Sequence, residues 1–444
     1  MTYFVPSDLQ ADAIHAIRDW FTTRTHAQQV FRVFGYAGSG KTTITRHAIA
    51  DLGLDTMVRD AAAGTVSRTG GVLYAAFTGK AALVMSRKGT PASTIHSLIY
   101  RVSEATQAEI EQVKEEIGVL ESALPGLGIG ERTMGEARLR SLKLRLADIH
   151  MPRFVLNDQS IVRDAALIVL DEVSMVGEEM ARDLLAFGKP ILVLGDPGQL
   201  PPIKGEGAFT RDAPDVMLTE IHRQAGESAI IRLATLARQG RRIAYGEHDP
   251  QVWKLPRSSV GPEQLLKGGQ VICGRNATRI QLNLAMKRAA GFEASYPTGE
   301  VQGSGHAEKI ICLKNRADLG IVNGMFLRLE DVEDENEVCF SARIEPEDAP
   351  AGATATGDGR YLIYKGHFDD HMAPDPERER RDHWVRKGLI EAVWGWAITA
   401  HKSQGSQWPN VVVLDDGLGR TALDRARWLY TAITRAERGL VLLD

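Results

Sequence analysis

Short apolar runs alternate with stretches of helical periodicity along both halves of the chain. Runs of this length, rich in Val, Ile and Leu and separated by helical segments, predict parallel strands covered by helices on both faces of a sheet. We therefore expect an α/β fold with one parallel-sheet domain in each half. The predicted strands fall at 30–38, 71–79, 166–172 and 189–196 in the first half, and at 270–275, 393–400, 411–416 and 439–444 in the second.

Two segments interrupt this alternation and predict inserted domains. The first is helical, and the second contains the strand-like pieces EKIICLKN and MFLRLEDV, which indicate a small β-rich domain. The expected organisation is a first sheet domain at 1–99 and 164–210, a helical insert at 100–163, a second sheet domain at 211–299 and 389–444, and a β-rich insert at 300–388.

The segment IEQVKEEIGVLESALPGLGIGERTMGEARLRSLKLRLADI, residues 110–149, predicts two helices joined by the turn PGLGIG. Apolar side chains recur at spacings of three and four in both arms, which indicates a packed seam. The first arm is acidic and the second basic, so an antiparallel hairpin of about 20 residues per arm, roughly 30 Å long, is expected. The predicted seam consists of Ile110, Val113, Ile117, Leu120 and Leu124 in the first arm and Leu139, Leu142, Leu146 and Ile149 in the second.

Composition narrows the class of protein. Of the 444 residues, 43% are hydrophobic and 25% are charged, and no apolar run approaches the roughly 18 residues that a membrane span needs. The start MTYFVPSDLQ is not expected to be a secretory signal. Cys273, Cys312 and Cys339 lack CxxC spacing and are expected to be buried thiols of an intracellular protein. With a net charge of −4, any site for a polyanion must be a local groove.

The strongest chemical signal is GYAGSGKTT, which lies between an apolar strand and the helical ITRHAIADL. It matches G-x-x-x-x-G-K-[ST], a loop whose glycines let backbone amides surround phosphate oxygens at a helix N-terminus. Lys41 is expected to reach the terminal phosphates, and the Thr42 hydroxyl to ligate Mg²⁺. Near the N-terminus, the amide of Gln10 can bond the edge of adenine, although a solvated helix residue is the alternative. The predicted nucleotide-binding residues are Gln10, Gly35, Gly38, Ser39, Gly40, Lys41, Thr42 and Thr43.

Two later apolar strands end in residues suited to hydrolysis. In ALIVLDEVSMV, Asp171 is expected to hold Mg²⁺ and Glu172 to accept the proton of the attacking water. In ILVLGDPGQLPPI, Gln199 is expected to sense the γ-phosphate from the loop above the sheet. Taken alone, the acidic pair is equally well a helix cap, but the P-loop upstream favours the catalytic interpretation. For Gln199, an incidental residue in a Pro-Gly turn is the less favoured alternative.

The order of motifs along the chain resembles the superfamily 1 DNA helicases, and within them the 5′-to-3′ branch that contains phage Dda and bacterial RecD. The resemblance implies two RecA-like domains with ATP and Mg²⁺ in the cleft between them, in a motor that moves 5′ to 3′ on single-stranded DNA and unwinds duplex. The motifs are Gln10, GYAGSGKTT, AAFTGKAA (75–82), ASTIHSL (92–98), VLDEVSMV, LGDPGQLPPI, LTEIHRQ (218–224), ITAHKSQGSQW (398–408) and LYTAITRAERG (429–439).

The resemblance also implies residue roles. Arg223 and Arg435 match the two arginines that cross the cleft in this family, where a guanidinium stabilises the transferring phosphoryl group only when the cleft is shut. With Lys41, Glu172 and Gln199 they form the implied catalytic set. Gln404 matches the residue that couples the DNA track to the nucleotide, and Trp408 is a weak stacking candidate. The implied contacts to single-stranded DNA are Phe77, Thr78, Lys80, Thr94, His96, Thr399, His401 and Lys402.

Several alternatives remain open. A translocase that does not unwind, an enzyme acting on RNA, and an ATP-binding clamp without turnover are the rival functions, and the intact catalytic set argues against the clamp. The hairpin is a structural spacer, a dock for a replication or recombination protein, or an arm that steers duplex DNA. Phe154, in PRFVLN, is a core residue or part of a β element that splits the duplex. The expected partners are single-stranded and forked DNA, bound by a monomer in the cytoplasm and nucleoid of a bacterial or phage-infected cell.

Overall fold

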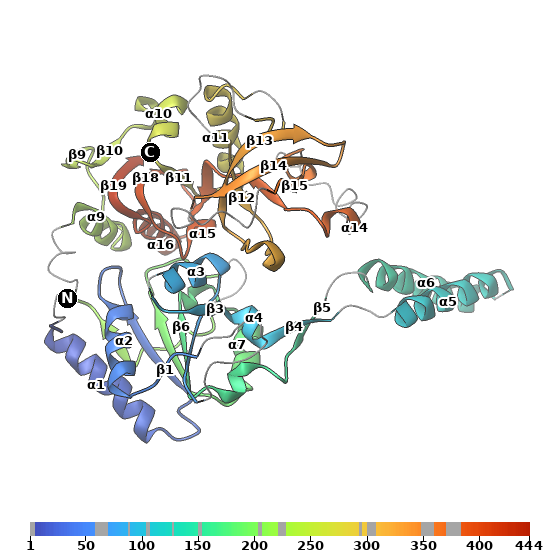
Figure 1. The fold of residues 1–444 in the computed structure, drawn as a ribbon, viewed down its shortest axis with the longest axis horizontal. Coiled ribbons are helices and arrows are strands. Elements are labelled where there is room, and N and C mark those ends of the chain that lie inside the picture. Colours follow the sequence, from blue (N-terminus) through green and yellow to red (C-terminus); the bar gives the residue numbers. More distant parts are fainter. Residues whose placement is uncertain are drawn as a thin grey trace. The chain divides into compact units, whose positions relative to one another are not determined.

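The computed structural model describes most of the chain in two compact units. One unit consists of Met1–Thr94 with Asp164–Asp444, and the other of Ile95–Arg163 (Figure 1). Among the described residues, the larger unit contains three β-sheets and the smaller a two-stranded ribbon with a helical hairpin. The described residues are 5–57, 70–87, 89–103, 107–126, 128–149, 153–202, 207–220, 228–292, 295–299, 308–347, 359–369 and 383–444.

The first sheet is parallel throughout its described pairings. Helices α1 (Asp8–Thr23) and α2 (Lys41–Asp51) share one apolar core with it, in which Ile17 and Ile44 are fully buried. The carboxyl ends of these strands gather the P-loop and the carboxylates at one edge, the usual ligand edge of a parallel sheet. In order, the strands are β3 (Ala92–Thr94), β2 (Val72–Ala76), β6 (Leu167–Asp171), β7 (Ile191–Gly195), β1 (Val30–Gly35) and β8 (Val216–Leu218).

The second sheet is also parallel, apart from antiparallel pairing at its β9 edge. Its strands alternate between two cores, as the period of two requires: Val411 and Val413 face α9 (Ala229–Arg238) and α16 (Ala422–Ile433), whereas Val412 faces α10 (Pro262–Lys267) and α11 (Asn276–Ala289). Helices therefore cover both faces. In order, the strands are β17 (Ala397–Thr399), β11 (Gln270–Cys273), β18 (Trp408–Leu414), β19 (Ala436–Leu443), β10 (Val252–Leu255) and β9 (Gly246–Asp249).

The third sheet is antiparallel and corrects one predicted strand. Residues 393–400, expected to form a single strand, divide between this sheet and the second parallel sheet. The break is at Gly395, where a Cβ atom would lie 2.9 Å from the backbone carbon of Ile310. The sheet also includes β16, which lies beyond residue 388, the predicted end of the β-rich insert. In order, its strands are β15 (Tyr361–Tyr364), β14 (Cys339–Pro346), β13 (Phe326–Asp334), β12 (Glu308–Cys312) and β16 (Ala392–Trp394).

The smaller unit contains the predicted helical hairpin. Helices α5 (Gln107–Ala123) and α6 (Ile129–Ile149) pack along a seam in which Val113, Ile117 and Leu142 are buried. Ile110, Leu120, Leu139 and Leu146 flank these three, as predicted, while Leu124 lies in the 3₁₀ turn η1 (Leu124–Gly126) and the side chain of Ile149 falls outside the described part. Lys143 and Glu121 form an ion pair of 2.6 Å between the arms.

A two-stranded antiparallel ribbon and a short helix complete this unit. Strands β4 (Tyr100–Ser103) and β5 (Arg153–Leu156) pair beside α4 (Ile95–Ile99). Phe154 is 53% exposed, so the interpretation as a core phenylalanine was wrong. Its ring instead meets the ring of His96 edge-on, with centroids 4.2 Å apart.

None of the helices in the described ranges combines the length and apolarity needed to cross a membrane. Cys273, Cys312 and Cys339 are buried thiols, as predicted, and burial raises the pKa of the first two to about 12. The other helices are α3 (Gly79–Arg87), α7 (Glu178–Leu185), α12 (Gly366–Asp369), α14 (His383–Arg386) and α15 (Ala400–Ser403), and the other 3₁₀ turns are η2 (Ile161–Asp164), η3 (Val173–Met175), η4 (Arg257–Ser259) and η5 (Ala317–Leu319).

Candidate nucleotide site

The P-loop joins β1 to the N-terminus of α2, as the motif predicts. Gly38 and Gly40 have φ values of 81° and 84°, a conformation that favours glycine. A Cβ atom on Gly35 would lie 2.4 Å from Ser39 Oγ, so a side chain there would collide with the loop. Thr43 is exposed on the first turn of α2. Backbone amides at this helix N-terminus are oriented to receive an anion.

Two P-loop side chains have bonding capacity that a triphosphate would use. Lys41 Nζ donates to the carbonyl oxygens of Gly35, at 2.7 Å, and Tyr36, at 3.2 Å. Ser39 is 1% exposed, and its Oγ forms no hydrogen bond in the structure. Because a buried hydroxyl without a partner is costly, a phosphate oxygen in the loop would stabilise Ser39 while giving Lys41 a charged partner.

Gln10 braces the P-loop from the first turn of α1. Its Nε2 donates to the Ser39 carbonyl at 3.1 Å, and its Oε1 accepts from the Ser7 amide at 3.1 Å in a capping box. The side chain is 5% exposed, so Gln10 is not a solvated helix residue. Both ends of its amide bond the protein here, and the contact to adenine remains a prediction.

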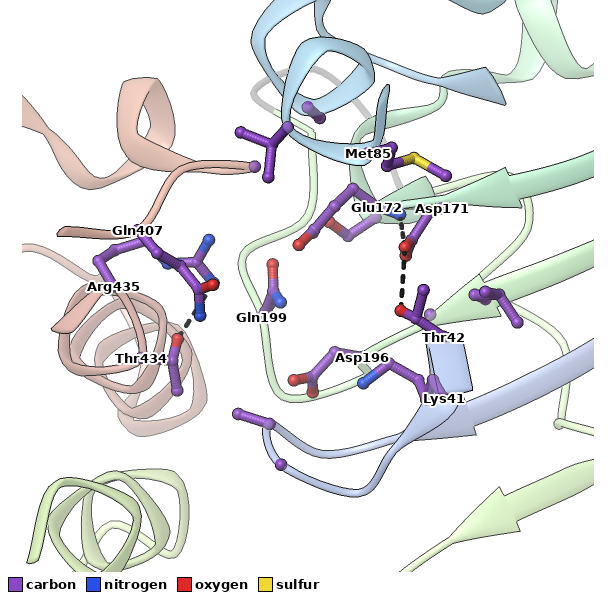
Figure 2. A pocket seen from close by; sticks show the side chains of 18 of the residues that line it. Lys41, Thr42, Met85, Asp171, Glu172, Asp196, Gln199, Gln407, Thr434 and Arg435 are labelled. Atoms are coloured by element: carbon purple, nitrogen blue, oxygen red, sulfur yellow. Dashed lines mark hydrogen bonds between the residues drawn. The ribbon is translucent and has the colours of Figure 1, made fainter. Parts of the chain in front are cut away.

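Asp171 is the last residue of β6 and lies beside Thr42 of α2, and Glu172 follows it directly (Figure 2). Thr42 Oγ1 lies 3.5 Å from Asp171 Oδ2, while Asp171 Oδ1 accepts from the Glu172 amide at 2.8 Å. No cluster of three or more His, Cys, Asp or Glu side chains suited to a metal occurs among the described residues. A hydroxyl and one carboxylate nevertheless fit Mg²⁺, which retains water and takes its other ligands from phosphate oxygens.

Glu172 is held at a strained position with a perturbed pKa. Its φ of 55° places a non-glycine residue in the left-handed region. Burial raises the pKa of Glu172, and the negative charges of Asp171 and Asp196 raise it further, whereas Arg435 and Lys41 oppose the shift. A carboxylate with a raised pKa is a stronger base, which suits the predicted role of accepting a proton from water.

Gln199 lies in the loop after β7, between the P-loop side and the Arg435 side of the pocket (Figure 2). It is 8% exposed, and its Oε1 forms no hydrogen bond in the structure. The backbone amide of Gln199 donates to the backbone carbonyl of Asp196 at 3.1 Å, which closes the turn. The side chain can therefore bond a group that enters the pocket.

Arg435 follows α16 of the second sheet and reaches the same pocket, of about 230 Å³ (Figure 2). Its side chain is 4% exposed and is held by three acceptors on its own side. Nε donates to the Thr431 carbonyl at 3.0 Å, Nη1 to the Ser406 carbonyl at 3.2 Å and Nη2 to Thr434 Oγ1 at 3.1 Å. Arg223, the other predicted arginine, lies outside the described residues.

Gln404 joins the second sheet to the loops of the first. Its Nε2 donates to the Leu200 carbonyl at 3.1 Å and to Ser174 Oγ at 3.4 Å. Leu200 follows Gln199 directly, and Ser174 lies two residues after Glu172. Gln404 therefore bonds the loops on the first-sheet side of the pocket, and its role in coupling DNA to the nucleotide remains a prediction.

Sequence reasoning missed a further contact of this kind, made by α16. Tyr430 and Thr431 bond the P-loop and the loop that carries Gln199. The signal in the sequence is weak: two polar side chains stand in the otherwise apolar LYTAI. Sequence periodicity alone does not show which loop such residues face.

Two predicted DNA residues of the larger unit lie in helices that follow strands: Lys80 in α3, after β2, and Lys402 in α15, after β17. Lys80 is 4% exposed, with Nζ 4.3 Å from the ring centroid of Phe326 and 4.8 Å from that of Trp408. Lys402 Nζ donates to Asn323 Oδ1 at 2.9 Å, and burial lowers its pKa. In this form of the protein, both ammonium groups contact protein, and their contacts to DNA remain predictions.

The other predicted DNA residues are half-buried. Thr78 Oγ1 accepts from the Ala81 amide at 3.1 Å at the start of α3, and Thr399 caps α15. Burial lowers the pKa of His401 and of His96, so neutral imidazoles are favoured there. Phe77 and Thr94 lie at the carboxyl ends of β2 and β3.

These features define a class of protein. A P-loop, two carboxylates after a parallel strand and an arginine from a second parallel sheet surround one pocket. This is the site of a P-loop nucleoside triphosphatase with two RecA-like sheets.

Comparison with known proteins gives the family. A model described as an AAA domain matches residues 9–250, and one described as a UvrD-like helicase C-terminal domain matches residues 395–443. The chain therefore belongs to the AAA-domain family and, with a UvrD-like helicase domain at 395–443, to the superfamily 1 helicases, as the motifs predicted.

The similar proteins include a curated relative and two solved structures. The ATP-dependent RecD2 DNA helicase of Deinococcus radiodurans is 26% identical over 286 residues, which are 61% of this chain and 35% of the relative, so the chain spans about a third of its length. A structure of two coordinating Pif1 helicases at forked duplex DNA aligns with a TM-score of 0.50 and 16% identity, covering 99% of this chain and 92% of the other. Pif1 from Bacteroides with ADP-AlF3 and single-stranded DNA aligns with a TM-score of 0.49 and 15% identity, with the same coverage. The first structural alignment confirms the predicted fold class.

Proposed function

We propose that the protein is an ATP-driven DNA helicase that moves 5′ to 3′ on single-stranded DNA. The observation that carries the proposal is the burial of Arg435, from the second sheet, in the pocket that contains Lys41 and Glu172. An arginine placed across a cleft links hydrolysis to the relative position of the two sheets, which is how a motor couples ATP to movement.

Each polar residue of the pocket has a role in hydrolysis. The P-loop amides and Lys41 would bind the phosphates, and Thr42 with Asp171 would hold Mg²⁺, which neutralises charge that develops on the phosphates. Glu172 would accept the proton of the attacking water, and Gln199 would bond the γ-phosphate. Arg435 would leave one or more of its three acceptors to stabilise the transferring phosphoryl group, an exchange that favours the transition state over bound ATP.

Strand separation is proposed for the β4–β5 ribbon. Phe154 presents an exposed ring, supported by His96, on a two-stranded element. An exposed aromatic can stack on the last base pair of a duplex and stabilise the separated bases. The helicases that the motifs resemble carry their duplex-splitting element at the corresponding position, which supports the proposal.

Forks with one tail test the proposal most directly. We expect ATP-dependent unwinding of a DNA fork that carries only a 5′ tail, and little unwinding of one that carries only a 3′ tail. Efficient unwinding from the 3′ tail would reverse the polarity. ATP hydrolysis without unwinding of either fork would indicate a translocase that does not separate strands. Faster unwinding of matched RNA forks would indicate that RNA is the substrate.

The same proposal extends to the setting of the enzyme. A DNA helicase of this class would act as a monomer on single-stranded and forked DNA in the cytoplasm, at the nucleoid, of a bacterial or phage-infected cell. Replication, repair and recombination are the processes that produce such forks.

A further inference from the structure

Tyr430 connects three parts of the nucleotide site through one oxygen atom. It lies in α16 and is 2% exposed. Its hydroxyl accepts a hydrogen bond from the Ala37 amide in the P-loop, at 2.8 Å, and donates to Asp196 Oδ2 at 2.6 Å. One phenol of the second sheet therefore bonds both the P-loop and the loop after β7.

The bond to Asp196 requires the phenol in its protonated form, because the hydroxyl donates to the carboxylate. Burial raises the pKa of Tyr430, and the negative charge of Asp196 raises it further. The hydroxyl consequently keeps its proton at any physiological pH and can donate to the carboxylate while it accepts from the amide. Phenylalanine would lose both bonds and retain the ring.

Tight packing fixes the ring in this position. A Cβ atom on Gly198 would lie 2.9 Å from Tyr430 Cε1 and 3.0 Å from Arg238 Cδ, so only glycine leaves room for both side chains. The Arg238 guanidinium lies 3.5 Å from the ring centroid of Tyr36, the P-loop residue before Ala37. The phenol thus has little freedom to seek other partners.

The loop that Tyr430 holds also carries Gln199. Asp196 Oδ1 accepts from the Gly198 amide at 2.9 Å, and the Leu200 amide donates to Thr431 Oγ1 at 3.0 Å. The segment is therefore attached to α16 on both sides of Gln199, and the same helix leads to Arg435. A displacement of α16 relative to the P-loop would move Gln199 and Arg435 together.

We propose that Tyr430 is a positioning residue for ATP hydrolysis, which aligns Gln199 and Arg435 with the P-loop through its bonds to Asp196 and the Ala37 amide. The inference rests on the proposed ATPase function. Tyr430 itself touches neither the phosphates nor the attacking water in this scheme. Its loss should lower the rate of the chemical step and leave nucleotide binding intact, because Lys41 and the P-loop amides remain.

The test compares Tyr430→Phe with Tyr245→Phe. Tyr245 also donates to a carboxylate, that of Asp444 at 2.5 Å, but it is 51% exposed. Neither Tyr245 nor Asp444 lines the nucleotide pocket. With saturating single-stranded DNA, we expect Tyr430→Phe to lower kcat by roughly tenfold, which corresponds to about 1.4 kcal/mol of activation free energy. Tyr245→Phe should leave kcat unchanged. The Kd of a fluorescent, non-hydrolysable ATP analogue should stay within about twofold of the parent in both variants.

Asp196→Asn provides the second arm and keeps the idea testable if Tyr430→Phe melts at a lower temperature. If the phenol acts through Asp196, the double variant should lose no more activity than the stronger single variant, since the two residues form one unit. Additive losses, a parental kcat in Tyr430→Phe, or a raised KM with unchanged kcat would each overturn the positioning role. A parent protein without DNA-stimulated ATPase would instead overturn the proposed function.

Discussion

The nucleotide pocket and the α5–α6 hairpin use polar residues in opposite ways. In the pocket, Gln199 and Arg435 are almost fully buried, and Arg435 is held by hydrogen bonds to the carbonyl oxygens of Thr431 and Ser406. In the hairpin, charged side chains lie on the surface, and pairs such as Lys114 with Glu111, at 3.2 Å, are half exposed or more. Buried polar groups are costly unless they are bonded, whereas surface ion pairs contribute little.

This difference indicates where function is concentrated. Ser39 Oγ and Gln199 Oε1 are buried atoms that form no hydrogen bond in the structure, and a ligand in the pocket would satisfy them. The described charges of the hairpin are exposed to water and require no ligand. We therefore expect the same substitution to have a large effect in the pocket and a small one in the hairpin.

The largest effect is expected for Lys41→Ala. Loss of the ammonium removes the main positive charge at the phosphates, so both ATP binding and the chemical step should weaken and turnover should be lost. Phosphate release in the presence of single-stranded DNA measures it. Lys114→Ala in the hairpin is the matched control and should retain parental turnover; equal losses in both would contradict the comparison.

Glu172→Gln should nearly abolish hydrolysis while ATP binding persists. The amide cannot accept the proton of water, but it keeps the shape of the carboxylate. In the parent, the pKa of Glu172 is raised, so the carboxyl group stays protonated to a higher pH than an ordinary carboxyl group. Because only the ionised form can accept the proton, kcat/KM should rise with pH as Glu172 ionises, at a pH above the usual carboxylate pKa. Glu115→Gln, on the exposed surface of α5, should change neither rate nor pH profile. A Glu172→Gln enzyme with the parental rate would remove Glu172 from the mechanism.

Arg435→Ala should lower kcat by roughly a hundredfold or more, as expected for an arginine that stabilises the transferring phosphoryl group. ATP affinity should change little, because Arg435 bonds Thr431, Ser406 and Thr434 before hydrolysis. Stopped-flow binding and steady-state turnover separate the two quantities. Arg132→Ala, which breaks an exposed pair with Glu136, is the control. Normal DNA-stimulated turnover in Arg435→Ala would make the residue structural.

Phe154→Ala should affect unwinding more than ATP hydrolysis. Removing an exposed ring costs little stability, and loss of stacking on one base pair, worth about 1–3 kcal/mol, should slow strand separation by roughly tenfold or more. Fork unwinding and DNA-stimulated ATPase are measured on the same preparation. Phe154→Trp should preserve unwinding. Parental unwinding by Phe154→Ala would exclude the ring from strand separation.

The smallest effect on the motor is expected when a short Gly-Ser linker replaces residues 106–148. DNA-stimulated ATPase should stay within about threefold, since the hairpin belongs to a separate compact unit and the length of a surface connection affects stability only weakly. Reduced fork unwinding would favour an arm that steers the duplex, reduced binding of a replication or recombination protein would favour a dock, and no change would favour a spacer. Loss of ATPase in a folded variant would place the hairpin in the motor core.

The features that the sequence determined are those in which local pattern is sufficient. GYAGSGKTT folds as a strand, loop and helix because its glycines, two of which adopt positive φ, specify the backbone of the loop locally. Asp171 could be placed because it ends an apolar run. The seam around Val113 and Leu142 followed from helical periodicity in the same way. Each of these depends on neighbours in the chain, so spacing alone predicts it.

Only the tertiary structure decided the contacts between distant segments. Tyr430 bonds Ala37, which is 393 positions away in the sequence, and the local sequence around either residue does not predict this contact. Residues 393–400 read as one strand because the backbone of Ile310, which excludes a side chain at Gly395, is remote in sequence. Phe154 looked like a core residue for the same reason, since its exposure depends on what packs nearby. Hydrophobic pattern shows that a side chain prefers burial, but the partner and the resulting geometry arise only when the whole chain is packed.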